Sequence, residues 1–169
     1  MRVDANIAKF VGMDAFFSDL IEPFFRLTAA VIVGALLGLN RDLYRKPAGL
    51  RLCALVSLGS CLTTLIASET PLGHTDPAAA SRVMQGIVGG VGFLGAGVIL
   101  HEGRENRVRN LTTAATIWMS AALGIACGVG AWRIAALGAI IALIVLTVGL
   151  YLDRVLFGRL GAEDQPAEE

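Results

Sequence analysis

Charged residues, aromatic residues and cysteines are all scarce in this chain. Charged residues make up 17% of its 169 positions, against roughly 25% in soluble domains, and the formal net charge of zero argues against nucleic-acid binding. The three cysteines lie singly inside apolar runs, which favours packing as small hydrophobic side chains over a disulfide framework or a metal site. No basic region with an apolar core and cleavage site precedes the first long apolar run, so we expect no signal peptide.

Motifs for catalysis and for coupled transport are missing as well. The sequence has no phosphate loop, Ser/His/Asp set, zinc-ligand spacing or paired mid-membrane carboxylates, so we expect no enzyme and no cofactor. GVGFLG at residues 90–95 spells the G-x-G-x-x-G of dinucleotide sites, but without the strand and acidic residue that give that motif meaning. The lack of ionisable residues at mid-depth argues against a carboxylate-lined cation transporter and leaves open a pore lined by backbone carbonyls.

Long apolar runs are what the chain does have. Hydrophobic residues make up 55% of it, and a membrane span needs about 20 mostly apolar residues. We predict an all-α integral membrane protein, a bundle of about five transmembrane helices preceded by a short interfacial helix at 13–21, where aromatic and acidic residues alternate. The expected spans are residues 24–39, 52–68, 83–101, 111–130 and 134–152.

The same runs divide the chain into three parts. Residues 1–23 form an extracytoplasmic or interfacial segment, residues 24–152 the transmembrane domain, and residues 153–169 a cytoplasmic tail that we expect to be disordered. Nine of the 14 Lys and Arg residues fall in 40–51, in 102–110 and after the last span. The positive-inside rule therefore predicts an N-terminus outside and a C-terminus in the cytoplasm.

Glycine is concentrated in the third span, where MQGIVGGVGFLGAGVIL at 84–100 has no charged residue. Each interior glycine costs a helix about 1 kcal/mol in water, whereas in lipid it lets two helix backbones touch. We expect this span to be the central packing helix. We favour packing of these glycines within one chain. The alternatives are self-association, which would give a homodimer, and contact with a partner protein. The expected packing glycines are Gly92 and Gly95, with the GxxxG pairs Gly34 and Gly38, Gly86 and Gly90, and Gly124 and Gly128.

Polar groups within the spans are mostly hydroxyls, among them Thr113 and Ser120, which we expect to form hydrogen bonds between helices. In the outer loop, Glu69 and Asp76 are weak candidates for binding a divalent cation. Asp76 precedes Pro77, however, and this order favours a helix N-cap with proline at the first helical position.

A basic cytoplasmic surface is the candidate functional site, with Asp42 expected to pair with an arginine across the two inner loops. The alternative for these charges is contact with lipid headgroups and a role in topology alone. The residues of this surface are Arg41, Asp42, Lys46, Arg51, Arg107 and Arg109.

The order of four motifs resembles the MgtC/SapB family of bacterial membrane proteins over residues 24–152. The motifs are GALLGLNRD at 34–42, KPAGLR at 46–51, DPAAASRVMQGIVGGVGFLGAGVIL at 76–100 and VRNLTTAATIWMSAALGIACGVG at 108–130. The resemblance implies an inner-membrane protein tied to growth in low magnesium and, in pathogens, to survival inside macrophages. Some members are described as restraining the membrane sector of the ATP synthase, and older labels associate the family with magnesium transport.

Three features depart from that family pattern. Asn40 stands where members often carry an acidic residue, and Thr112 and Met119 stand where the virulence-related members carry Asn and Cys. The chain is also expected to be a short form that lacks a soluble C-terminal domain. The sequence thus favours a non-enzymatic regulator of another membrane complex, with a magnesium or small-solute transporter or channel as the alternative and a membrane enzyme as a third reading without support.

Overall fold

The computed structural model describes residues 2–68, 77–100 and 110–152. This part of the chain forms five helices: α1 (Arg2–Leu43), α2 (Leu50–Ser68), α3 (Pro77–Leu100), α4 (Leu111–Gly128) and α5 (Trp132–Leu152). All five are long and apolar enough to cross a membrane. The predicted all-α membrane fold is therefore confirmed. The tail at 153–169 lies outside the described residues.

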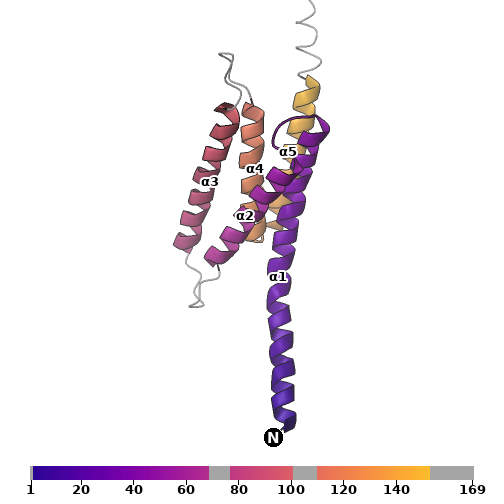
Figure 1. The fold of residues 1–169 in the computed structure, drawn as a ribbon, viewed down its shortest axis with the longest axis vertical. Helices are drawn as coiled ribbons and strands as arrows, with labels where there is room; N and C mark the ends of the chain where they lie inside the picture. The colour runs from indigo at the N-terminus through magenta and orange to yellow at the C-terminus, as the bar shows by residue number, and fades with distance from the viewer. Residues whose placement is uncertain (1, 69–76, 101–109, 153–169) are drawn as a thin grey trace, which may run out of the picture.

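Successive helices run in alternating directions, so the chain crosses the bundle five times (Figure 1). α1 ends, α2 begins and α4 begins at the same end of the bundle, together with the C-terminal end of α5. We call this end the basic end, because Arg41, Arg45, Lys46 and Arg51 lie there. The opposite end carries the ends of α2 and α4 and is called the far end.

The first helix differs from the expected interfacial helix followed by a separate span. α1 is one helix of 42 residues with Pro23 inside it, and its membrane-spanning part is Asp19–Leu43. Proline removes one backbone donor and does not by itself end a helix in a membrane protein, where other groups satisfy the freed carbonyl. The N-terminal part of α1 continues beyond the other helices at the far end (Figure 1).

α4, and not the glycine-rich α3, is the central helix. Half of the spanning window of α4 is buried, against 11% for α3, and α4 packs against all four other helices. α3 lies at the side of the bundle, against α4 and α2 (Figure 1). The expectation of a central third span is therefore wrong, because its glycines offer little side chain to bury and several have open space in front of them.

Small residues make the core of the bundle. The three cysteines are free and buried, as their apolar surroundings predicted, and two of them pack with Ala30, Leu65 and Ala135. At Gly34 an added Cβ would lie 2.5 Å from the carbonyl oxygen of Cys53. Backbones this close leave no room between α1 and α2.

The same close approach joins α2 to α4. An added Cβ at Gly124 would overlap the backbone of Ser57, and one at Gly128 would lie 2.7 Å from Cβ of Thr64. Gly38 likewise packs on the backbone of Leu50. Four of the expected packing glycines thus lie where α1, α2 and α4 touch. A Cβ added at Gly95 would lie 3.4 Å from Cβ of Ala114, an ordinary van der Waals distance.

Candidate functional site

A tight turn at the basic end joins α1 to α2. The N–H groups of Tyr44 and Lys46 donate to the carbonyl of Arg41 at 3.2 and 3.0 Å. The backbone then passes through positive φ at Arg45 (52°) and Ala48 (62°), so the chain reverses within a few residues. This geometry brings the side chain of residue 42 back over the start of α2.

Asp42 uses that position to cap α2. Its Oδ2 accepts a hydrogen bond from the N–H of Leu50 at 2.8 Å, which satisfies one of the donors that a helix N-terminus leaves free. Gly49 lies directly under the carboxylate, and a Cβ there would overlap it. Within the described residues the carboxylate binds backbone and no guanidinium. The arginines of the second inner loop lie outside those residues, so the pairing of Asp42 with an arginine across the two loops stays a prediction.

Arg41 is not a surface residue, contrary to expectation. Only 2% of it is exposed, because its side chain turns into the bundle and Nη2 donates to Oγ1 of Thr113 on α4 at 2.5 Å. Nε has no hydrogen-bond partner among the described residues. Since a guanidinium carries five N–H donors and a charge, one hydroxyl satisfies only part of its demand.

A cavity of about 340 Å³ opens beside this guanidinium and is called the Arg41 pocket. Lys46 also lines it, so two cations from the predicted set meet there. Arg51 is exposed at the start of α2 and is not part of the lining. Arg107 and Arg109 lie outside the described residues. The lining consists of Arg41, Lys46, Asn110, Leu111, Thr112, Thr113, Val145, Leu146, Gly149 and Leu150.

The hydroxyls in the middle of the bundle are mostly used within their own helices. Thr64 donates to the carbonyl of Ser60 at 2.7 Å, and Ser120 donates to the carbonyl of Thr116 at 2.9 Å. Of the expected bonds between helices, the one from Arg41 to Thr113 is present. Ser57, in the same seam, has no hydrogen-bond partner for its hydroxyl among the described residues. Because the other hydroxyls already have backbone acceptors, the buried seam between α2 and α4 is mainly a packing surface rather than a row of free ligands.

Several α3 glycines have open space in front of them. Nothing in the described chain lies within 4 Å of a Cβ placed at Gly86, Gly90 or Gly92, so their expected packing partners are absent from the described residues. Phe93, on the same helix, is 82% exposed. An apolar hollow of about 410 Å³ separates α3 from α2 and is called the α2–α3 groove. It is lined by Leu55, Val56, Gly59, Ser60, Thr63, Ile87, Gly90, Val91 and Leu94.

At the far end, Arg26 ties α1 to the end of α4. Its Nη1 donates to the carbonyl of Gly128 at 2.6 Å, one of the acceptors that a helix C-terminus leaves free. Nη2 forms an ion pair with Glu22, one turn earlier on α1. Gly130, with a φ of 73°, packs under the guanidinium, where a side chain would come within 3.1 Å of Nη2.

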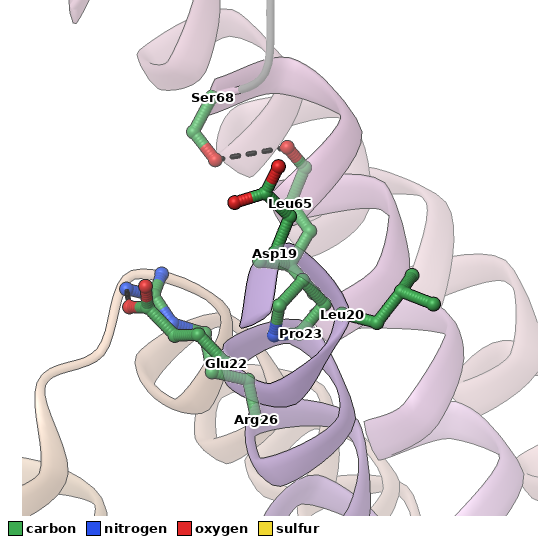
Figure 2. Close-up of a pocket in the computed structure, with 7 residues that line it drawn as sticks. All are labelled: Asp19, Leu20, Glu22, Pro23, Arg26, Leu65 and Ser68. Carbon is green, nitrogen blue, oxygen red and sulfur yellow. Dashed lines mark hydrogen bonds and ion pairs between the residues drawn. The ribbon is translucent and has the colours of Figure 1, made fainter. Parts of the chain in front are cut away.

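An open cavity of about 750 Å³ lies next to this contact. Figure 2 shows Glu22 and Arg26 extending together on one side of α1, while Ser68 donates to the carbonyl of Leu65 at the end of α2. Among the described residues, no group of three His, Cys, Asp or Glu could hold a metal ion. The candidate cation ligands Glu69 and Asp76 lie outside those residues.

A family model, described as the MgtC family, matches residues 27–155. The chain belongs to the MgtC family. It is 41% identical to Protein SrpB of Synechococcus elongatus over 149 residues, which cover 83% of this chain and 82% of SrpB. It is 44% identical to Protein MgtC of Salmonella typhimurium over 117 residues, 69% of this chain and 48% of that protein.

A third MgtC-family relative is the uncharacterised protein slr0014 of Synechocystis sp., 40% identical over 123 residues, which cover 73% of this chain and 50% of slr0014. The chain thus spans most of SrpB but about half the length of the other two relatives. No solved structure matches it. The family match contains the Arg41 pocket, the Asp42 cap and the α2–α3 groove.

Sequence reasoning missed three features of this MgtC-family chain. Thr113 was expected to bond between helices, but not to be the acceptor for a buried arginine. Arg26 was not singled out, although Gly130, four residues before the span expected from residue 134, indicates a helix end that needs a cap. Gly59 was not singled out, because one glycine in an apolar run carries no spacing signal.

Proposed function

We propose that this MgtC-family membrane protein is a non-enzymatic regulator that binds a transmembrane helix of another membrane protein in the α2–α3 groove. The observation that carries the proposal is glycine in both walls of an open apolar groove. Neither Gly59 on α2 nor Gly90 on α3 has a described atom within 4 Å of a Cβ placed there. Both therefore expose helix backbone to whatever occupies the groove.

Exposed helix backbone is a feature of helix–helix contact in membranes. Small residues let two helices approach closely, and association then depends on packing because lipid is as apolar as the side chains. Lipid tails fill such a surface less closely than a helix of matching shape. Gly59 and Gly90 lie in the two walls of the groove among larger apolar side chains, so a helix lying in the groove can approach the backbone at these two points.

The packed core favours this reading over transport through the centre of the monomer. α1, α2 and α4 touch backbone to backbone at Gly34, Gly124 and Gly128. Three hydroxyls between them, those of Thr64, Thr116 and Ser120, donate to carbonyls of their own helices. A solute path through this region needs helices to separate and hydrophobic contacts to be lost.

The remaining parts of the proposal rest on family resemblance and on charge. We place the protein in the bacterial inner membrane with the basic end in the cytoplasm, since Lys and Arg gather there. The segments 1–23 and 153–169 flank the membrane domain. The role is adaptation to low magnesium, with virulence in those members that live in hosts. The membrane sector of the ATP synthase is the partner to test first.

The first test fills the groove. Gly90→Leu places a side chain in the groove, while Gly92→Leu adds the same side chain to the same helix outside the lining and serves as the control. We expect Gly90→Leu to insert and melt like the parent but to lose complementation of growth in low magnesium. Gly92→Leu should complement. Full complementation by Gly90→Leu and by Gly59→Leu would remove the groove from the function.

The second test addresses the partner. ATP-driven proton pumping is measured in inverted membrane vesicles with and without the chain. Slower pumping in the presence of the chain, restored by Gly90→Leu but not by Gly92→Leu, supports the ATP synthase. Unchanged pumping excludes that partner. A photoreactive residue at Leu94, which lines the groove, then distinguishes the occupants, since an adduct at twice the chain mass assigns the groove to a homodimer.

Liposomes test the transport alternative. The purified chain is reconstituted, and entry of Mg²⁺ is followed with a trapped indicator dye. We expect entry at the rate of empty liposomes. Saturable uptake that depends on the chain would replace regulation with transport.

A further inference from the structure

Among the described residues, the Arg41 guanidinium has no negatively charged partner. It is 2% exposed, its one described hydrogen bond goes to the neutral hydroxyl of Thr113, and its Nε has no partner among the described residues. The nearest carboxylate in sequence, that of Asp42, is occupied in capping α2. Buried charges in proteins are normally paired or fully hydrogen-bonded.

The Arg41 pocket has the charge and size for an anionic group. Lys46 adds a second cation to its lining, and Thr112 and Asn110 add polar groups around a cavity of about 340 Å³. Arg41 lies two residues from Leu43, where the spanning part of α1 ends. The pocket is therefore at the depth of lipid headgroups, which Lys and Arg side chains reach from the ends of spans.

An apolar groove continues from this pocket toward the middle of the membrane. Thr112, Val145 and Leu146 line both hollows. The second hollow, which we call the α4–α5 groove, has a volume of about 360 Å³. It follows α4 as far as Trp118 and Met119, and Leu37 of α1 forms part of it.

We propose that the Arg41 pocket and the α4–α5 groove together bind one anionic phospholipid. The phosphate is held by Arg41 and Lys46, and an acyl chain lies along the α4–α5 groove. A free phosphate ion would occupy only the Arg41 pocket and would leave the α4–α5 groove without an occupant. A phospholipid would fill both the pocket and the groove. This site lies between α4 and α5 and is separate from the α2–α3 groove of the proposed function.

The two tryptophans of the chain allow a direct test. Trp118 lines the α4–α5 groove, and Trp132 begins α5 at the far end. In a Trp132→Phe chain, fluorescence reports Trp118 alone. This chain is placed in phosphatidylcholine vesicles that contain a small fraction of either dibrominated phosphatidylglycerol or dibrominated phosphatidylcholine, whose bromines quench tryptophan from the acyl chain. We expect stronger quenching by the brominated phosphatidylglycerol.

Charge variants show whether that preference comes from the pocket. Lys46→Gln should lower the relative association constant for phosphatidylglycerol about fivefold, the factor that corresponds to about 1 kcal/mol for one cation at a membrane surface. Arg51→Gln removes the same charge from an exposed residue outside the lining and should keep the preference. Arg41→Gln should abolish it.

Three results would overturn the site. They are equal quenching by the two brominated lipids, a preference that survives both Lys46→Gln and Arg41→Gln, and an equal loss of preference in Lys46→Gln and Arg51→Gln. Inorganic phosphate in the buffer gives the remaining arm. Equal quenching by the two brominated lipids together with binding of inorganic phosphate would assign the pocket to a free anion, whereas competition between phosphate and phosphatidylglycerol supports a lipid phosphate held in the same pocket. If Arg41→Gln fails to fold, the comparison of Lys46→Gln with Arg51→Gln still decides.

Discussion

The carboxylate of Asp42 and the backbone N–H of Leu50 form a 2.8 Å hydrogen bond across eight residues. This bond ties the end of α1 to the beginning of α2. It also explains why NRD at 40–42 and KPAGLR at 46–51 occur together, because one motif supplies the cap and the other supplies the turn and the glycine beneath it.

Removal of this cap should lower the stability of the fold, whereas the cations of the Arg41 pocket remain in place. We expect Asp42→Ala to lower the free energy of unfolding by about 1 kcal/mol, and Asp42→Asn to retain most of it because an amide oxygen also accepts the bond. Thermal unfolding in detergent measures both. A Tm for Asp42→Ala equal to that of the parent would show that the bond carries no stability.

Gly49→Ala tests the same contact from the other side. Its Cβ would overlap the Asp42 carboxylate, so we expect the substitution to lower Tm. The double variant Gly49→Ala with Asp42→Ala should lose less than the sum of the two single effects, since the overlap disappears with the carboxylate. Additive losses in Tm would contradict the proposed contact.

Substitution of glycines that have the same GxxxG spacing should lower the free energy of unfolding by very different amounts. Gly124→Ala inserts a Cβ into the Ser57 backbone, and overpacking of this kind costs about 1–3 kcal/mol. Gly90→Ala adds a Cβ in open space and should leave unfolding unchanged or slightly stabilise the helix. Unfolding in increasing denaturing detergent compares them. Similar losses for both would mean that α3 packs as closely as α4.

The hydrogen bond from Arg26 to Gly128 should contribute more to the free energy of unfolding than the ion pair between Arg26 and Glu22. Arg26→Ala leaves the carbonyl of Gly128 without its donor, a loss of about 1–3 kcal/mol. The Glu22 side chain is 68% exposed, and exposed pairs contribute at most about 1 kcal/mol. We therefore expect Glu22→Gln to unfold close to the parent. Arg133→Ala, an exposed cation at the same end, is the control for loss of charge.

Orientation is testable with reporter fusions. Cation asymmetry predicts that fusions after Lys46, Thr75, Arg107 and Glu169 report cytoplasm, outside, cytoplasm and cytoplasm in turn. A cytoplasmic signal at Thr75 would reverse the orientation of the basic end. It would also place the Arg41 pocket in the outer leaflet.

Helix number and family could be predicted from the sequence alone. Each span satisfies its own backbone hydrogen bonds, so length and apolarity suffice to find it. The first boundary was predicted wrongly: the separate helix expected at 13–21 and the span expected from residue 24 are one helix. Pro23 and the acidic residues near it suggested a boundary at the membrane surface. They do not end the helix, because the residues on both sides of Pro23 are helical.

The positions of the glycines and arginines were decided only by tertiary structure. Gly86 and Gly90 have the same spacing as Gly124 and Gly128, yet only the second pair meets a neighbouring backbone. Spacing places two residues on one face of a helix, but the rotation of that helix against its neighbours decides whether the face is buried. Arg41 and Arg51 differ in the same way. The side chain of Arg41 turns into the bundle and binds Thr113, whereas that of Arg51 is exposed, because the two positions lie on differently oriented faces of their helices.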